Sequence, residues 1–292
     1  MYISAKSGVI ILMIGLISLS STAQSTIPYT KGRIVVSSDG NEHDHDDWAA
    51  TPLTLALLAS AGLQDSLVVY TFSDHIWGSN QEKENGKAQM LESVLKGKEI
   101  FNFKNSNFIE AVADSTSAIR AITQEIDKSD KHSPLNIIAA GPMHVVGRAL
   151  ENANPSKLKY VRLISHSKWN NEHADKPYDW EKPHSGWTWD EIKENFESNG
   201  LAMDKILDQN GGDGYQGFKA PIQEYNWVKT SAIRDTSPKI KKQMDWLYDR
   251  LLTCVKKGDF DPSDAGMVVY LLTGKEKTDP SDARKLIENP TH

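Results

Sequence analysis

RIVVSSDGNEHDHDDWAATPLTLALLASAGL (Arg33–Leu63) contains a strand, a loop and a helix in succession, and this order indicates the fold class. The β-branched, apolar RIVVSS (Arg33–Ser38) predicts a buried strand. The segment Trp48–Leu63 predicts a helix, with Pro52 near its first turn, where a missing N–H is tolerated. An acidic loop lies between them, directly after the carboxyl end of the predicted strand.

The same alternation continues along the chain. Further buried strands are predicted at Ser66–Phe72, Leu135–Ala140 and Tyr160–Ser165, with helical patterns at about 81–95, 107–126 and 145–153. Helices are also expected near Trp189, over 238–258 and over 263–274. This pattern predicts an α/β fold of Rossmann type, with a mostly parallel sheet flanked by helices. Ligands of such sheets bind outside the carboxyl ends of the strands.

Composition is typical of a soluble globular protein. The 292 residues are 39% apolar and 25% charged, and the net charge of −6 argues against a nucleic-acid-binding surface. Residues 1–23, with an apolar run before Ala23, predict a signal peptide and an exported protein, periplasmic or extracellular. Residues 24–292 are then expected to form one domain. The lone Cys254 is expected to be a buried structural residue.

Residues 167–227 are rich in tryptophan and predict long ordered loops inserted in the domain. Aromatic faces stack on sugars and on nucleobases alike. We therefore expect two of the five tryptophans in this segment to face a ligand; the five are Trp169, Trp180, Trp187, Trp189 and Trp227.

The acidic run Ser37–Trp48 has four interpretations. It can be a solvated loop, although carboxylates crowded at a strand end repel each other unless a cation or protons neutralise them. A calcium EF-hand fails, because its sixth and twelfth positions would hold Asp44 and Ala50. Zinc on His43 and His45 would resemble a metallo-β-lactamase-type hydrolase, although Trp48 replaces the final histidine of that motif. The fourth interpretation is a hard cation such as calcium, held by oxygen ligands of Asp39, Asp47 and a carboxylate distant in sequence.

Three motifs together resemble the nucleoside hydrolase superfamily, of which this chain would be a divergent secreted member. They are DGNEHDHDD (Asp39–Asp47), IIAAGPMHVVGRAL (Ile137–Leu150) and SDAGMVVYLL (Ser263–Leu272). The chain departs from the family pattern at Asn41, where the family has aspartate, and by one extra residue before the paired aspartates. Ser263 stands where many members carry a histidine that assists the leaving group.

The resemblance implies a role for each matching residue. Asp39 would be a metal ligand and the catalytic base, Asp47 and Asp264 would bind calcium, and the His144 backbone carbonyl would add a ligand. Asn41 and Asp46 would contact sugar hydroxyls. By their positions after predicted strands, further substrate contacts are expected from Asp74, His75 and His166. Asn170, Asn171 and Glu172 are candidates, by position, for the Glu/Asn pair with which the family binds the ribose 5′-hydroxyl. Trp169 and Trp187 are the tryptophans expected to stack on the ligand.

The leading hypothesis is therefore an exported, calcium-dependent hydrolase that uses a calcium-bound water to cleave a glycosidic bond. Its substrate would be a saccharide or nucleoside, and a homo-oligomer is a candidate assembly. Nucleic acid and membrane are not expected as partners. Two alternatives stay open. One is a non-catalytic carbohydrate-binding protein on the same fold, and the other is a zinc hydrolase of the metallo-β-lactamase type.

Overall fold

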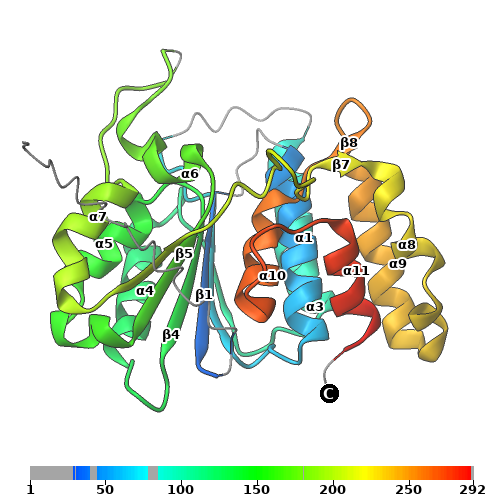
Figure 1. Ribbon diagram of the computed structural model, residues 1–292, viewed down its shortest axis with the longest axis horizontal. Coiled ribbons are helices and arrows are strands. Elements are labelled where there is room, and N and C mark those ends of the chain that lie inside the picture. Colours follow the sequence, from blue (N-terminus) through cyan, green and yellow to red (C-terminus); the bar gives the residue numbers. More distant parts are fainter. Residues whose placement is uncertain (1–28, 30, 40–44, 78–84, 180, 291–292) are drawn as a thin grey trace, which may run out of the picture.

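The computed structural model describes residues 29, 31–39, 45–77, 85–179 and 181–290. A six-stranded parallel sheet runs through it in the order β3-β2-β1-β4-β5-β6 (Figure 1). This is the Rossmann strand order, and the predicted α/β fold is confirmed. The strands are β1 (Arg33–Ser38), β2 (Leu67–Phe72), β3 (Asn107–Glu110), β4 (Leu135–Ala140), β5 (Val161–Ser165) and β6 (Ala202–Lys205).

Helices cover both faces of the sheet (Figure 1). One face carries α4 (Ser115–Asp127), α5 (His144–Asn152) and α7 (Trp189–Phe196). The other carries α1 (His45–Ser60), α3 (Gly97–Ile100), α9 (Pro238–Thr253), α10 (Gly266–Thr273) and α11 (Pro280–Glu288). Alternate residues of β1 enter the two cores, because successive side chains of a strand point to opposite faces. Ile34 and Val36 pack with α1, and Val35 packs with α4 and α5.

Helix α1 is buried along most of its length because it lies between the sheet and the outer helices. It begins at His45, earlier than predicted, so Pro52 falls inside the helix and not in its first turn. Proline cannot donate to the carbonyl four residues before it, which is that of Trp48. The Ser93 hydroxyl donates to this carbonyl at 2.6 Å and satisfies it.

The helix predicted over 107–126 is wrong at its beginning. Residues Asn107–Glu110 form β3, which pairs with β2, and α4 begins only at Ser115. Asp114 caps α4, with its side chain accepting from the Ser117 N–H at 2.9 Å. The helix predicted over 81–95 corresponds to α2 (Gly86–Leu91), a π-helical turn (Glu92–Lys96) and α3, while residues 78–84 lie outside the described part.

The tryptophan-rich segment 167–227 is more regular than predicted. It contains α6 (Lys168–Glu172), α7, β6, β7 (Ala220–Pro221) and the start of α8 (Trp227–Thr230). Strand β7 pairs with β8 (Asp259–Phe260), and irregular chain remains mainly at 176–188 and 206–219. Trp189 and Trp227 are buried core residues and do not face a ligand site.

The carboxyl-terminal third returns to helices as predicted, although α9 ends at Thr253 and α11 was not predicted. Cys254 is buried, as expected. The predicted signal peptide, residues 1–23, lies outside the described residues. Within the described part of the chain, none of the helices combines the length and the apolar character that crossing a membrane requires.

Candidate functional site

Three aspartates meet at the carboxyl edge of the sheet, and we call them the acidic triad. Asp39 follows β1, Asp47 lies in the first turn of α1, and Asp264 lies in the short 3-10 turn Ser263–Ala265 before α10. One carboxylate oxygen from each lies within 4.8 Å of the others. Asp39 and Asp47 are only 6% and 4% exposed. The structure thus brings together the three carboxylates that the sequence nominated as metal ligands.

Asp39 occupies the switch point of the sheet, where the strand order reverses between β1 and β4. Its N–H donates to the Ala140 carbonyl at 2.9 Å, which continues the pairing of the two strands. Gly141 follows, and a Cβ at that position would lie 2.6 Å from the Asp39 nitrogen. The glycine of the GPMH turn is therefore required for this close approach of the two chain segments.

Helix beginnings supply the other two carboxylates. Asp47 lies in the first turn of α1, and Asp264 precedes α10 directly. The exposed N–H groups and positive dipole end of a helix stabilise a negative charge there. Asp46, the neighbour of Asp47, is exposed. It is the residue predicted to contact a sugar hydroxyl.

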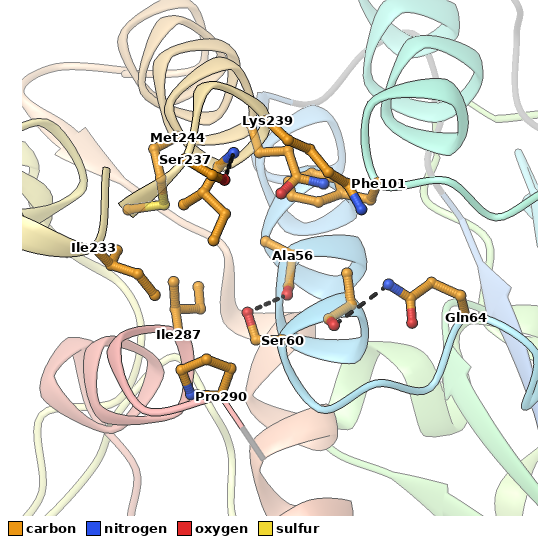
Figure 2. Close-up of a pocket in the computed structure, with 13 residues that line it drawn as sticks. Ala56, Ser60, Gln64, Phe101, Ile233, Ser237, Lys239, Met244, Ile287 and Pro290 are labelled. Atoms are coloured by element: carbon orange, nitrogen blue, oxygen red, sulfur yellow. Dashed lines mark hydrogen bonds between the residues drawn. The ribbon is translucent and has the colours of Figure 1, made fainter. Parts of the chain in front are cut away.

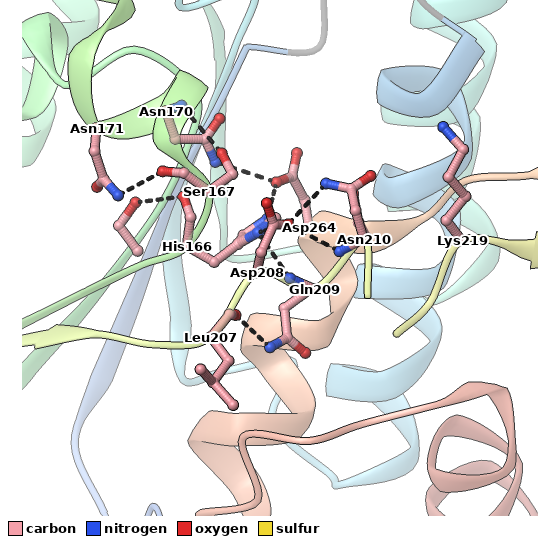
Figure 3. A network of polar contacts seen from close by, with 12 residues as sticks. His166, Ser167, Asn170, Asn171, Leu207, Asp208, Gln209, Asn210, Lys219 and Asp264 are labelled. Carbon is pink, nitrogen blue, oxygen red and sulfur yellow. Dashed lines mark hydrogen bonds and ion pairs between the residues drawn. The ribbon is translucent and has the colours of Figure 1, made fainter. Parts of the chain in front are cut away.

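His166 fixes the orientation of Asp264 (Figure 3). This histidine follows β5 and is 1% exposed, and its Nε2 lies 2.7 Å from Asp264 Oδ1. The Asn170 side-chain amide donates to the same oxygen at 3.3 Å. Because both bonds engage Oδ1, the orientation of the carboxylate is set and Oδ2 can serve as a ligand.

The other ring nitrogen of His166 is approached by the chain that follows β6. The Gln209 backbone N–H donates to His166 Nδ1 at 3.2 Å, and Asp208 Oδ1 lies 3.5 Å from the same nitrogen. Burial lowers the pKa of His166, but the hydrogen bonds and charges of Asp208 and Asp264 outweigh it and raise the pKa to about 9. In the neutral ring Nδ1 accepts from the Gln209 N–H, whereas in the charged ring the Nδ1 hydrogen faces Asp208 Oδ1 instead. In both forms Nε2 carries the hydrogen that Asp264 accepts.

A strained residue begins the helix that carries Asn170 and Asn171. Ser167 has φ of 62°, which is uncommon outside glycine, and its hydroxyl accepts from the Asn170 N–H at 3.1 Å. The Asn171 amide donates to the Ser167 carbonyl. Strained residues of this kind concentrate at functional sites. The structure thus gives Asn170 a contact with the triad and gives Asn171 a supporting position behind it.

The triad offers only carboxylate oxygens, the kind of ligand that hard cations such as calcium accept. Calcium takes oxygen ligands at about 2.3–2.6 Å, so opposite ligands on one ion lie at most roughly 5 Å apart. The triad oxygens lie within 4.8 Å of one another, close enough for one ion to contact all three. Three carboxylates leave several of the 6–8 calcium positions for carbonyls, water or substrate hydroxyls.

Asp74 lies one strand away, after β2, and its side chain is fully buried. Hydroxyls of Ser37 and Thr71 donate to its Oδ2, the latter at 2.8 Å, and among the described residues its Oδ1 has no hydrogen-bond partner. Burial raises the pKa of Asp74 to about 7 despite these two hydrogen bonds. The structure therefore places Asp74 inside the sheet, where it has no surface exposed to a substrate.

His75 belongs to a second group, which we call the histidine cluster: His75, His173, Glu181 and His184. One ligand atom from each lies within 4.8 Å of the others. Trp169 does not present its face to the triad, since its ring stacks on His173 with centroids 4.4 Å apart. These residues come from three separate segments, so no contiguous sequence pattern groups them.

The side chains of the remaining predicted site residues contact groups outside the triad, while the His144 backbone carbonyl stays a predicted ligand. The Trp187 ring packs on Gly147 of α5 and on Phe196 of α7, and Glu172 pairs with Lys176. The His144 side chain lies against Trp77, with ring centroids 4.7 Å apart. Asn41, His43 and Trp180 lie outside the described residues.

His45, the other half of the alternative zinc site, begins α1. Its ring packs on Trp48 with centroids 4.5 Å apart. Sequence reasoning missed two residues that the structure adds to the site, Asp208 and Gln209. The only signal for them would have been the short, half-exposed strand β6 that precedes them.

A cavity of about 190 Å³ lies beside the carboxyl-terminal end of α1 (Figure 2). Asp47 of the triad lies in the first turn of the same helix, at its other end. Its lining is mainly apolar and comes from α1, α9 and α11, with Phe101 at one side. None of the triad or histidine-cluster residues lines it. This cavity is therefore not part of the candidate site.

Comparisons with known proteins give one relative and no family assignment. The chain is 29% identical to a protein of Formosa agariphila described as "Uncharacterized protein P22", over 264 residues. The match covers 87% of this chain and 88% of the relative. No protein-family model and no solved structure matches the chain.

Proposed function

We propose that this protein is a calcium-dependent hydrolase that cleaves the glycosidic bond of a saccharide or nucleoside at the acidic triad. One observation carries the proposal: carboxylates from β1, α1 and the turn before α10 converge at the switch point of a Rossmann-ordered sheet. Ligands of open α/β sheets bind at such a point. The resemblance of the three sequence motifs to nucleoside hydrolases supports the same assignment.

Asp39, Asp47 and Asp264 would hold the ion. Bound there, calcium would order sugar hydroxyls and lower the pKa of a water molecule. Asp39 is the residue best suited to take a proton from the attacking water, because it lies at the switch point between the two halves of the sheet. General bases of this kind accelerate reactions about 10²–10⁴-fold.

The charge of the site suits the reaction. Glycosyl cleavage passes through a state with positive charge on the sugar, which nearby carboxylates stabilise. His166 and Asn170 act as positioning residues, since both bond to Asp264 Oδ1 and fix the carboxylate. Asp46 is exposed beside Asp47 and is the described residue that we assign to a sugar hydroxyl.

The test is a hydrolysis screen of p-nitrophenyl glycosides, nucleosides and oligosaccharides, run with calcium and again with the calcium chelator EGTA. We expect turnover of at least one glycoside that EGTA abolishes and added calcium restores. Turnover unaffected by EGTA would contradict the proposal. Calcium-independent binding of a sugar without any product would identify a carbohydrate-binding protein instead.

A further inference from the structure

We propose that His75, His173, Glu181 and His184 form a zinc site, separate from the acidic triad. Three imidazole Nε2 atoms face one buried carboxylate. His173 Nε2 lies 3.2 Å and His75 Nε2 lies 3.4 Å from Glu181 Oε1, while His184 Nε2 lies 3.7 Å from Glu181 Oε2. The side chains are between 1% and 4% exposed.

These separations match the ligands of a tetrahedral zinc ion. Zinc binds imidazole nitrogen and carboxylate oxygen at about 2.0–2.2 Å, so neighbouring ligand atoms of a tetrahedron lie roughly 3.3–3.5 Å apart. The distances from the three nitrogens to the Glu181 carboxylate, two to Oε1 and one to Oε2, lie between 3.2 and 3.7 Å. Zinc binds imidazole nitrogen readily, whereas calcium takes oxygen ligands. The histidine cluster and the acidic triad therefore suit different ions.

The tautomer of His184 gives an independent reason for a metal. Its Nδ1 lies 3.0 Å from the Ala174 carbonyl, which can only accept, so Nδ1 carries the hydrogen. Nε2 of the neutral ring is then a lone pair, buried and directed at the Glu181 carboxylate, and it has no hydrogen-bond partner among the described residues. Two buried acceptors that face each other need a proton or a cation between them, and a zinc ion would serve all three histidines at once.

Neighbouring groups hold the proposed ligands in place. The Tyr178 backbone N–H donates to Glu181 Oε2 at 2.7 Å and orients the carboxylate. Trp77 stacks on His184 at a centroid distance of 4.3 Å, and Trp169 stacks on His173. Metal-binding histidines usually donate their second N–H to a carbonyl or carboxylate, as His184 does to Ala174.

Four protein ligands would close the coordination shell, which is typical of structural zinc. His75 follows β2, His173 follows α6, and the other two ligands lie in the irregular chain before α7. An ion at this point would tie the chain around 173–184 to the end of β2. We therefore assign the zinc a structural role, which is to fix this part of the tryptophan-rich segment on the sheet edge.

The experiment is metal analysis of the full chain after incubation with zinc sulfate and removal of excess ion, with zinc affinity measured by competition with a chromophoric chelator. We expect one zinc per chain in the wild type. Glu181→Gln and His184→Ala should each weaken zinc binding about 100-fold or more. His132→Gln is the matched control, since His132 is exposed in the loop between α4 and β4 and should leave zinc binding unchanged.

Three further readouts separate a zinc site from a merely packed histidine cluster. Cobalt substitution should give the intense visible absorption of a tetrahedral site, and the zinc chelator TPEN should make the chain around 173–184 sensitive to protease. Circular dichroism establishes that each variant is folded. Because glutamine has nearly the shape of glutamate, loss of zinc binding in a folded Glu181→Gln reports the missing carboxylate and not misfolding. A wild type that retains no zinc, or a folded Glu181→Gln that retains it with unchanged affinity, would overturn the proposal.

Discussion

The acidic triad and the histidine cluster lie at the same edge of the sheet but differ in their donor atoms. The triad presents oxygens of Asp39, Asp47 and Asp264, whereas the cluster presents three imidazole nitrogens and one carboxylate. Hard cations select the first set and zinc selects the second. Asp74 and His75 are neighbours after β2, yet Asp74 is buried against hydroxyl groups and His75 belongs to the histidine cluster. A position after a strand therefore does not by itself determine the role of a side chain.

The largest expected effect separates catalysis at the triad from structure at the cluster. Asp39→Asn keeps the size of the side chain but removes a base and a charged ligand. We expect kcat/KM for the identified glycoside to fall by about 10²–10⁴-fold, measured at saturating calcium. Asp249→Asn, an exposed position on α9, is the control and should have wild-type activity.

If Asp39→Asn retained full activity while Glu181→Gln lost it, the roles of the two sites would be reversed. The assignment of catalysis to the triad and of a structural role to the histidine cluster would then be wrong.

The second prediction concerns Asp74, whose pKa is raised to about 7 by burial. Between the unfolded pKa near 3.8 and this value, the folded state binds more protons than the unfolded state, so stability falls as pH rises from about 4 to 7. A shift of about three pKa units corresponds to at most about 4 kcal/mol. Urea denaturation across this pH range measures it.

Asp74→Asn supplies the comparison for that experiment. The variant cannot ionise at this position, so its free energy of unfolding should fall less steeply than that of the wild type between pH 4 and 7. Parallel curves for the two proteins would show that Asp74 titrates normally in the folded state.

A third prediction tests the geometry that sets Asp39. In Gly141→Ala the new Cβ would meet backbone atoms of Asp39, which cannot move aside as a flexible side chain would. We expect a loss of about 1–3 kcal/mol in stability and weaker calcium binding, with zinc binding retained. Equal loss of both ions would mean that the two sites share one scaffold.

The smallest expected effect concerns His166, which acts on the triad through Asp264. His166→Gln should weaken calcium binding about 10-fold, because Asp264 loses the group that orients it. His132→Gln serves again as the control. Calcium titration measures both, and an unchanged affinity in His166→Gln would remove the positioning role.

The sequence predicts best those features whose residues are contiguous in the chain. The strand RIVVSS and the acidic loop after it are contiguous, so the parallel sheet and two triad residues were within reach of pattern reasoning. Asp264 was reached only through a family-like motif. Strand β3 was missed because NFIE (Asn107–Glu110) lies directly before a strong helical pattern.

The histidine cluster shows what pattern reasoning cannot reach. Its ligands come from separate turns, and only Glu181 and His184 have helix-like spacing, in a segment that is not helical. The tryptophans of this segment predicted aromatic faces open for stacking on a sugar. Trp169 instead stacks on His173, and Trp187 packs on Gly147. Which aromatic faces remain open depends on tertiary packing, which composition does not determine.

Calcium titration calorimetry of the chelator-treated wild type and of Asp264→Asn tests the central claim most directly. The account predicts one calcium per wild-type chain and loss of that binding in Asp264→Asn, whose remaining two carboxylates cannot complete the site. Absence of calcium binding in the wild type, or equal binding in the folded variant, would contradict it.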